Sequence, residues 1–244
     1  MKQRLDQAMT ARGLTPTRSQ AESYIRLGKV TVNGKIATKT GLLVAREDTV
    51  ALHVSQQYVS RAGLKLASVA QLFHVDFMGK TVLDVGSSTG GFTDYVLQHG
   101  AQKVIAVDVG TDQLHSSLHG NPRIELHEKT DIRDFVAHER IDAVVMDVSF
   151  ISLRAILPHI ATLVTPRTDV VAMVKPQFEA GASNIKHHGV IKNDRMRRDV
   201  LQDFEQWVRG RFVIIDKADS AVPGAKGNRE RFYLLRLASQ PTKH

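Results

Sequence analysis

The sequence predicts an α/β protein whose main part is a mostly parallel, doubly wound sheet, preceded by a small α+β module. Past residue 60 the chain alternates short apolar runs with longer amphipathic runs, as expected for buried parallel strands separated by helices. Before that point the pattern is helix, helix, hairpin. The excess of basic residues is also largest in this first part.

The first part, residues 1–58, is predicted to hold two helices and a hairpin. Apolar residues at helical spacing predict helices over 4–14 and 16–28. The stretch VTVNGK alternates apolar and polar residues and contains Asn33 and Gly34, the pair favoured by a type I′ hairpin turn. A unit of this size is small for independent stability.

The second part, residues 59–244, follows a short polar linker, VSQQY. Its predicted strands are 81–86, 103–110, 141–148, 169–175, 211–216 and 231–237. Its predicted helices are 61–73, 92–100, 152–164 and 195–210. We find no internal repeat.

Composition narrows the class of protein. Hydrophobic residues make up 42% of the 244 and charged residues 24%, as in a globular chain. The absence of cysteine excludes disulfides, thiolate metal sites and a cysteine nucleophile, and no metal is expected. There is neither an apolar run long enough to span a membrane nor a signal peptide, so a cytoplasmic protein without a membrane partner is expected.

Charge points to a polyanionic partner. The net charge is +8, and residues 1–58 hold nine Lys and Arg against four Asp and Glu, which places +5 of it in the small module. A basic module on a nearly balanced body favours nucleic acid first and an anionic membrane second.

The stretch LDVGSSTGGFTD predicts a ligand-binding turn. A strand ends there in Asp84, and Gly86, Gly90 and Gly91 precede a helix. Glycines permit a tight turn and a close approach of ligand to backbone. The spacing is not the G-x-G-x-x-G of dinucleotide sites, and no lysine follows as in a phosphate-binding loop, so a nucleoside ligand fits better.

Two acids follow the next strands. Asp108 ends a strand 22 residues after Gly86, where an acid is placed to bind ribose hydroxyls. Asp131 follows a third strand and is a candidate to face an adenine amino group; a solvated loop acid is the alternative.

Two more strands end in charged residues. Asp147 ends the apolar run AVVM, and Lys175 ends VVAMV just before Pro176, which cannot continue a ladder. Ligands of doubly wound sheets bind beyond the carboxyl ends of the strands, so this pair is either part of a site or a structural salt bridge.

Six motifs occur in the order of a known family: SRAGLKL, DVGSSTGGFTD, VDVG, DVSFIS, VKPQFE and GNRERFYLL. Together they resemble the RrmJ/FtsJ-type RNA ribose 2′-O-methyltransferases. Nearly the whole chain is similar to the TlyA, or hemolysin A-like, branch, in which an S-four RNA-binding domain precedes the methyltransferase. The resemblance implies a Rossmann-like class I methyltransferase fold.

The resemblance also implies a Lys-Asp-Lys-Glu catalytic tetrad at Lys65, Asp147, Lys175 and Glu230. By itself Lys65 would be interpreted as a surface lysine of an amphipathic helix. Glu230 would be interpreted as an exposed acid before an edge strand.

S-adenosylmethionine is the cofactor that the resemblance implies, with its ribose on Asp108 and its adenine near Asp131. The implied cofactor-binding residues are Asp84, Gly86, Ser87, Ser88, Thr89, Gly90, Gly91, Phe92, Asp108 and Asp131. Distant members of the class have a proline and a tryptophan in the glycine turn, where this chain has Thr89 and Phe92.

The implied substrate is ribosomal RNA or a ribosomal subunit, methylated at a cytidine of the small subunit, the large subunit or both. No obligate protein partner is indicated. Phosphate contacts position RNA more than they specify sequence. The candidate phosphate contacts are Arg4, Arg18, Arg26, Lys29, Lys35 and Arg61.

Methyl transfer to a ribose hydroxyl needs the acceptor to be oriented and its proton to be taken or shared. Lys175 is the candidate for this task, either as a base or by orienting the hydroxyl. Lys65 would supply a neighbouring cation, and Asp147 and Glu230 would hold the two amines in register.

Three alternatives stay open at the level of sequence. A non-catalytic RNA-binding assembly factor would not methylate ribosomal subunits, a membrane-active haemolysin would lyse liposomes, and a nicotinamide-dependent oxidoreductase would bind NADH.

Overall fold

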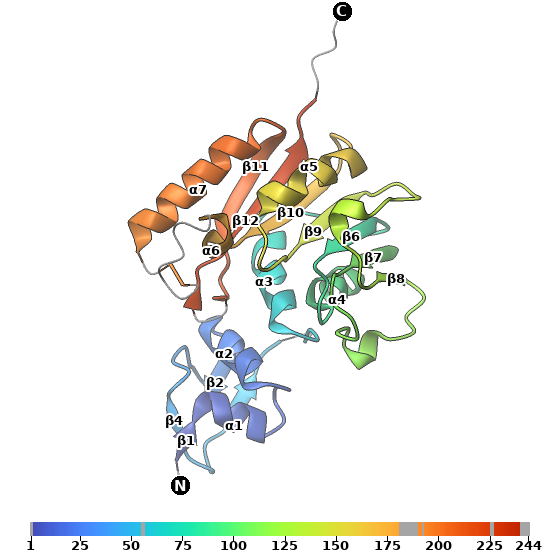
Figure 1. Ribbon diagram of the computed structural model, residues 1–244. Coiled ribbons are helices and arrows are strands. Elements are labelled where there is room, and N and C mark those ends of the chain that lie inside the picture. Colours follow the sequence, from blue (N-terminus) through green and yellow to red (C-terminus); the bar gives the residue numbers. More distant parts are fainter. Residues whose placement is uncertain (1, 55–56, 181–189, 192, 225–226, 240–244) are drawn as a thin grey trace, which may run out of the picture.

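The computed structural model describes residues 2–54, 57–180, 190–191, 193–224 and 227–239, and its centre is a seven-stranded sheet (Figure 1). In spatial order the strands are β11 (Phe212–Asp219), β12 (Arg231–Leu237), β10 (Asp169–Val174), β9 (Ala143–Met146), β6 (Thr81–Val85), β7 (Lys103–Val107) and β8 (Ile124–His127). Only the two pairings of β12 are antiparallel. The predicted mostly parallel sheet is therefore confirmed.

The sheet winds outward in two directions from β6 and β9, which are neighbours although 57 residues separate Val85 from Ala143. The turn after Val85 and the loop after Met146 consequently meet at the carboxyl edge of the sheet. This is the position at which doubly wound folds bind ligands.

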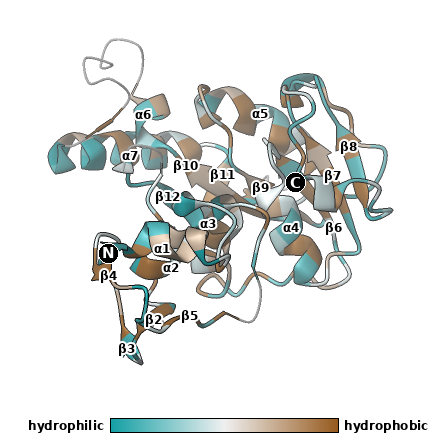
Figure 2. Ribbon diagram, turned by 90° about the horizontal axis from the view of Figure 1, so that it is seen from below, coloured by the Kyte–Doolittle hydropathy of each residue, from teal (hydrophilic) through white to brown (hydrophobic). Residues whose placement is uncertain are grey.

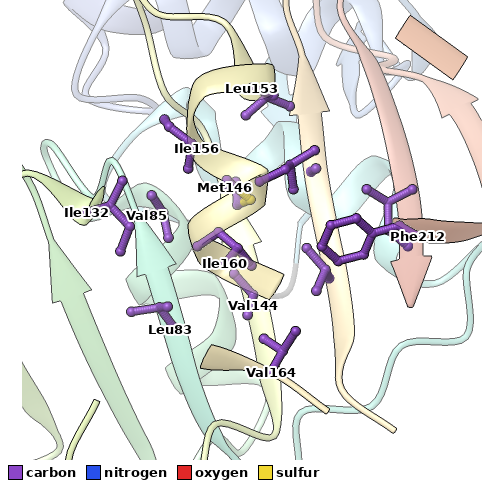
Figure 3. Close-up of a cluster of buried hydrophobic side chains, with 14 of the residues drawn as sticks. Leu83, Val85, Ile132, Val144, Met146, Leu153, Ile156, Ile160, Val164 and Phe212 are labelled. Carbon is purple, nitrogen blue, oxygen red and sulfur yellow. The ribbon is translucent and has the colours of Figure 1, made fainter. Parts of the chain in front are cut away.

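Helices cover both faces of the sheet. α5 (Leu153–Leu163) and α7 (Asp194–Val208) pack on one face, in the cluster of Figure 3, and α3 (Arg61–Ala70) and α4 (Gly91–Gln98) pack on the other. Side chains of successive strand residues point to opposite faces, which explains why each strand is a continuous apolar run.

Element bounds differ slightly from the predicted ones. The predicted helix 195–210 starts one residue earlier, because the side chain of Asn193 accepts hydrogen bonds from the backbone N–H groups of Arg195 and Met196. β11 is longer than predicted and has an irregular register between Ile214 and Asp216. The short helices are α6 (Pro176–Glu179) and the 3₁₀ helices η1 (Ser116–Leu118) and η2 (Ile132–Asp134).

The N-terminal part has the predicted order. Its elements are β1 (Gln3–Arg4), α1 (Leu5–Ala11), α2 (Arg18–Arg26), β2 (Val30–Val32), β3 (Lys35–Ile36), β4 (Leu43–Val44) and β5 (Val50–Leu52). Asn33 and Gly34 join β2 to β3 with φ angles of 50° and 76°, as a type I′ turn requires. The first helix starts one residue later than predicted, because Arg4 pairs with Leu43 in a ladder, and it ends at Ala11 rather than at residue 14.

The N-terminal part lies beside α3, with α2 nearest to it (Figures 1 and 2). Gln20 donates from Nε2 to the carbonyl of Tyr58 at 2.8 Å, and Arg61 donates to Ser19 Oγ at 3.3 Å. Within the described residues, no helix has both the length and the apolar character to cross a membrane.

Candidate active site

Three adjoining cavities lie at the carboxyl edge of the sheet, and Asp147 and Ser149 line all three. The first, of about 400 Å³, lies between the glycine turn after β6 and the loops after β7 and β8. The second, of about 130 Å³, lies behind the glycine turn. The third, of about 470 Å³, extends toward the first turn of α3. The loop after β9 thus forms a wall shared by all of them.

The glycine turn makes a close approach to this wall. Gly86 has φ +79°, and a Cβ there would lie 3.1 Å from the carbonyl oxygen of Asp147. The backbone of the turn therefore touches the loop after β9, as glycine permits. Ser87 is buried in the second cavity, and its hydroxyl has no hydrogen-bond partner among the described residues.

Asp108 lines the first cavity and also fixes the glycine turn. Its carboxylate accepts hydrogen bonds from the backbone N–H of Ser88 at 2.8 Å and from that of Gly110 at 2.7 Å. Two N–H groups hold the acid at one orientation, so it presents a fixed acceptor to the cavity.

Asp131 lines the same cavity. The hydrogen bonds from the Arg133 side chain and backbone lower the pKa of Asp131 to about 2. The carboxylate is therefore charged at neutral pH and remains an acceptor, which suits a ligand amino group.

Three of the predicted cofactor residues lie outside the cavities. Asp84 is fully buried, accepts a 2.6 Å hydrogen bond from Thr93, and has its pKa raised to about 7 by burial. Gly90 packs against Leu114 and Leu118, and Gly91 packs against α3. These three residues therefore support the glycine turn without lining a cavity, whereas Ser87, Thr89 and Phe92 line the second cavity.

The third cavity holds two ion pairs, of which the first is buried and the second is partly buried. Lys65 Nζ lies 2.6 Å from Glu230 Oε2, and Lys175 Nζ lies 2.6 Å from Asp147 Oδ1. The structure thus brings together all four residues of the implied tetrad. Each lysine is paired with one carboxylate, Lys65 with Glu230 and Lys175 with Asp147.

Ser149 is a further candidate site residue, which is not among the catalytic residues that the family resemblance implies. Lys175 Nζ donates to its hydroxyl at 2.7 Å. The amine is consequently held by two oxygens from one loop, those of Asp147 and Ser149. A hydroxyl two residues after a strand-end acid was the available signal, but its lysine partner is 26 residues away.

Aromatic side chains form the open rim of the third cavity. Phe150 is 91% exposed and has φ +67°, a conformation that bulky residues rarely adopt. Its ring lies 5.3 Å from that of Phe178, and both line the cavity together with Gln177. Strained, exposed positions of this kind cluster at ligand sites.

Glu179 ties together the two loops that carry these groups. Its carboxylate accepts hydrogen bonds from Ser152 Oγ at 2.6 Å and from the backbone N–H of Leu153 at 2.7 Å, at the start of α5. Burial raises the pKa of Glu179, against the opposing effect of these two bonds. The acid therefore fixes the Lys175 loop against the Asp147 loop.

Replacing Glu179 by alanine is expected to lower kcat of the methyl transfer that the family resemblance implies by about ten- to a hundredfold, since a displacement near 1 Å of catalytic groups has effects of that size. Glu179→Gln keeps an oxygen for the N–H of Leu153 and should retain most of the activity. Steady-state kinetics at saturating cofactor would show the difference. Equal kcat values for the two variants would contradict the role.

In the N-terminal part, the structure pairs two of the candidate RNA contacts with one acid. Arg4 and Arg18 both donate to the buried Asp6, Arg4 through Nε at 3.0 Å and Nη2 at 2.8 Å and Arg18 through Nε at 2.8 Å. Both guanidinium side chains remain partly exposed. Arg26, Lys29 and Lys35 are exposed.

Comparison with known proteins gives consistent matches. The model of the FtsJ-like methyltransferase family matches residues 58–237, and that of the S4 domain matches residues 3–50. The 16S/23S rRNA (cytidine-2′-O)-methyltransferase TlyA of Mycobacterium tuberculosis is 37% identical, over 96% of this chain and 89% of its own length. Hemolysin A of Brachyspira hyodysenteriae is 37% identical, over 93% of this chain and 97% of its own.

A solved structure is similar over almost the entire chain. It is that of a candidate hemolysin from Streptococcus thermophilus, with a TM-score of 0.72, 35% sequence identity, and coverage of 98% of this chain and 90% of that one.

Proposed function

This chain belongs to the FtsJ-like methyltransferase family, and from that premise we propose that it transfers a methyl group from S-adenosylmethionine to a ribose 2′-hydroxyl of ribosomal RNA. One observation carries the proposal. The wall formed by Asp147 and Ser149 separates a nucleoside-sized cavity from a cavity that holds two lysine–carboxylate pairs. A donor on one side and an acceptor on the other would meet at this wall.

The first two cavities fit S-adenosylmethionine. Asp108 would accept hydrogen bonds from the ribose hydroxyls and Asp131 from the adenine amino group, while the hydroxyl of Ser87, which has no partner among the described residues, would be available to the methionine part. When bound, the cofactor supplies a methyl group activated by a positively charged sulfur. Ser87, Thr89 and Phe92 would hold the methionine part beside Asp147.

Lys175 is the residue that acts on the acceptor. Two positions of its tetrahedral Nζ face Asp147 and Ser149, which leaves one for the 2′-hydroxyl. In the neutral amine that position is a lone pair that takes the hydroxyl proton; in the ammonium it is an N–H that orients the hydroxyl oxygen. Lys65 and Glu230 complete the wall of the third cavity, called the acceptor cavity from here on because it would receive the RNA nucleotide.

The acceptor nucleotide would have to leave its stack to reach this cavity. Phe150 and Phe178, whose rings lie against each other at this cavity, would stack with the unstacked base, because aromatic rings offer a stacking surface to any base. The related TlyA enzyme is named for cytidine in 16S and 23S rRNA, and we propose the same nucleoside here.

The N-terminal S4 domain would bind the RNA backbone. Asp6 pre-orients Arg4 and Arg18, and Arg26, Lys29 and Lys35 add charge on the same module. Because such contacts release counterions, affinity for ribosomal subunits should fall steeply with salt. Arg61, at the start of α3, lines the acceptor cavity and would contact RNA next to the reacting nucleotide.

Asp6 gives this module a measurable response to acid. Burial opposes ionisation, but hydrogen bonds from Arg4 and Arg18 outweigh it and lower the pKa of Asp6 from its usual 3.8 to about 2. A lowered pKa means that the ionised acid stabilises the fold above its usual pKa, and that this stabilisation is lost as pH falls toward 2. Denaturant unfolding of the wild type and Asp6→Asn should give free energies that converge between about pH 5 and pH 2. A constant difference would contradict the pairing.

Mapping 2′-O-methyl groups on small and large ribosomal subunits tests the proposed function. Unmethylated subunits incubated with the protein and S-adenosylmethionine should gain a methyl group at a cytidine, and subunits incubated without the protein should not. A protein that only assists ribosome assembly would leave both maps identical.

A further inference from the structure

The core of the N-terminal module is completed by two residues from the methyltransferase part. All buried members of this core lie in residues 5–44 except Leu64 and Val222. Leu64 belongs to α3, and Val222 belongs to the chain between β11 and β12. Both are nearly inaccessible to solvent, with exposures of 5% and 1%.

Each of these two residues lies on a segment that carries one member of the same ion pair. Lys65 follows Leu64 on α3, and its carboxylate partner Glu230 lies at the end of the connection that holds Val222. The next residue of α3, Leu66, packs in the core of the larger sheet. Leu64, Lys65 and Leu66 therefore contact, in that order, the core of the N-terminal module, the acceptor cavity and the core of the larger sheet.

Hydrogen bonds also link α3 to the connection between β11 and β12 and hold the two ends of that connection together. Ser68 Oγ donates to the carbonyl of Lys65 at 2.6 Å and accepts from the backbone N–H of Ala221 at 3.4 Å. Ser220 N–H donates to the carbonyl of Glu230 at 3.0 Å. Val222 directly follows Ser220 and Ala221, whose backbone N–H groups bond to Glu230 and to Ser68 of α3, so it is linked to both segments that carry the ion pair.

The Lys65–Glu230 pair depends on this arrangement. Its side chains are 6% and 3% exposed, and a buried charge is costly unless its partner stays in contact. Among the described residues, no β-ladder links α3 to the connection that ends in Glu230. The apolar core of the N-terminal module packs against both segments through Leu64 and Val222, and the core of the larger sheet also contacts α3 and the strand after Glu230, through Leu66 and Phe232.

We propose that the N-terminal module is a structural half of the active site, because its core packs around Leu64 and Val222 and so holds Lys65 and Glu230 in contact. Leu64 and Val222 are positioning residues in this arrangement. The inference rests on the proposed methyl transfer for its effect on catalysis. It goes beyond RNA binding, since the module would act on the reaction as well as on substrate affinity.

Matched valine variants test the proposal in the full-length chain. Val222→Ala and Val44→Ala remove the same atoms from the same core, but Val44 lies on β4 within the module. At saturating ribosomal subunits, Val222→Ala should lower kcat about ten- to a hundredfold with little change in KM, and Val44→Ala should keep kcat. Leu64→Ala should behave like Val222→Ala, and the volume-conserving Leu64→Met should restore kcat.

A second measurement does not depend on activity. Acylation of amines followed by peptide mass spectrometry should find Lys65 protected in the wild type and in Val44→Ala, and labelled in Val222→Ala. Equal labelling and equal kcat in the two valine variants would overturn the proposal. Wild-type protein that transfers no methyl group would refute the proposed function instead, and the labelling would still decide whether the module holds the pair.

Discussion

Replacing Lys175 by methionine is expected to reduce methyl transfer to ribosomal RNA by about 10²–10⁴-fold, the range that positioned proton-transfer groups contribute. Methionine keeps most of the apolar stem but cannot hydrogen-bond the 2′-hydroxyl. S-adenosylmethionine affinity should change far less than turnover, because Lys175 lines only the smaller of the two cavities proposed for the cofactor and not the one that holds Asp108 and Asp131. Single-turnover transfer of labelled methyl groups, together with calorimetric titration of the cofactor, would separate the two effects.

Lys80→Met is a suitable control for this variant. Lys80 also faces a carboxylate, Asp169 at 4.0 Å, but it precedes β6 at the opposite edge of the sheet. Wild-type turnover in Lys175→Met would remove the lysine from the mechanism. Loss of turnover in both variants would show a general effect of losing a lysine.

Asp108→Ala is expected to raise the dissociation constant of S-adenosylmethionine by about 10- to 100-fold, since hydrogen bonds to a charged group contribute about 1.5–3 kcal/mol. The change removes the acceptor for the ribose and also frees the N–H groups of Ser88 and Gly110. Isothermal titration calorimetry measures the effect directly. Asp134→Ala, at an exposed acid outside the three cavities, is the control. An unchanged dissociation constant would refute the ribose role.

The sheet was predictable because its signal is local. Continuous apolar runs between amphipathic ones identify buried parallel strands, and the ends of those runs place Asp147 and Lys175 at one edge. Topology placed the two residues together, and the family resemblance assigned them to a catalytic site. The residue-by-residue roles stay predictions until variants are measured.

Burial of the other two tetrad residues was not visible in the sequence. Lys65 and Glu230 are interpreted as surface residues from their local patterns, and only the family resemblance indicates otherwise. In the structure, segments far away along the chain cover both side chains, so that both are nearly inaccessible to solvent. The pairing of Glu179 with Ser152 was missed for the same reason, since it joins residues 27 apart in two loops.

The division of the chain at residue 58 also stays a prediction. It follows from a polar linker and a change of pattern, both of which are local. Leu64 and Val222 show that packing crosses this division, because the core of the first part includes side chains from the second.

That shared core has a consequence for the order in which the protein is made. A chain is synthesised from its N-terminus, and domains generally fold as they emerge. Here the first domain to emerge lacks Leu64 until α3 has been made and lacks Val222 until β11 has been completed. The module therefore reaches its final packing only after most of the methyltransferase has been synthesised, so the first part of the chain to be made is among the last to be finished.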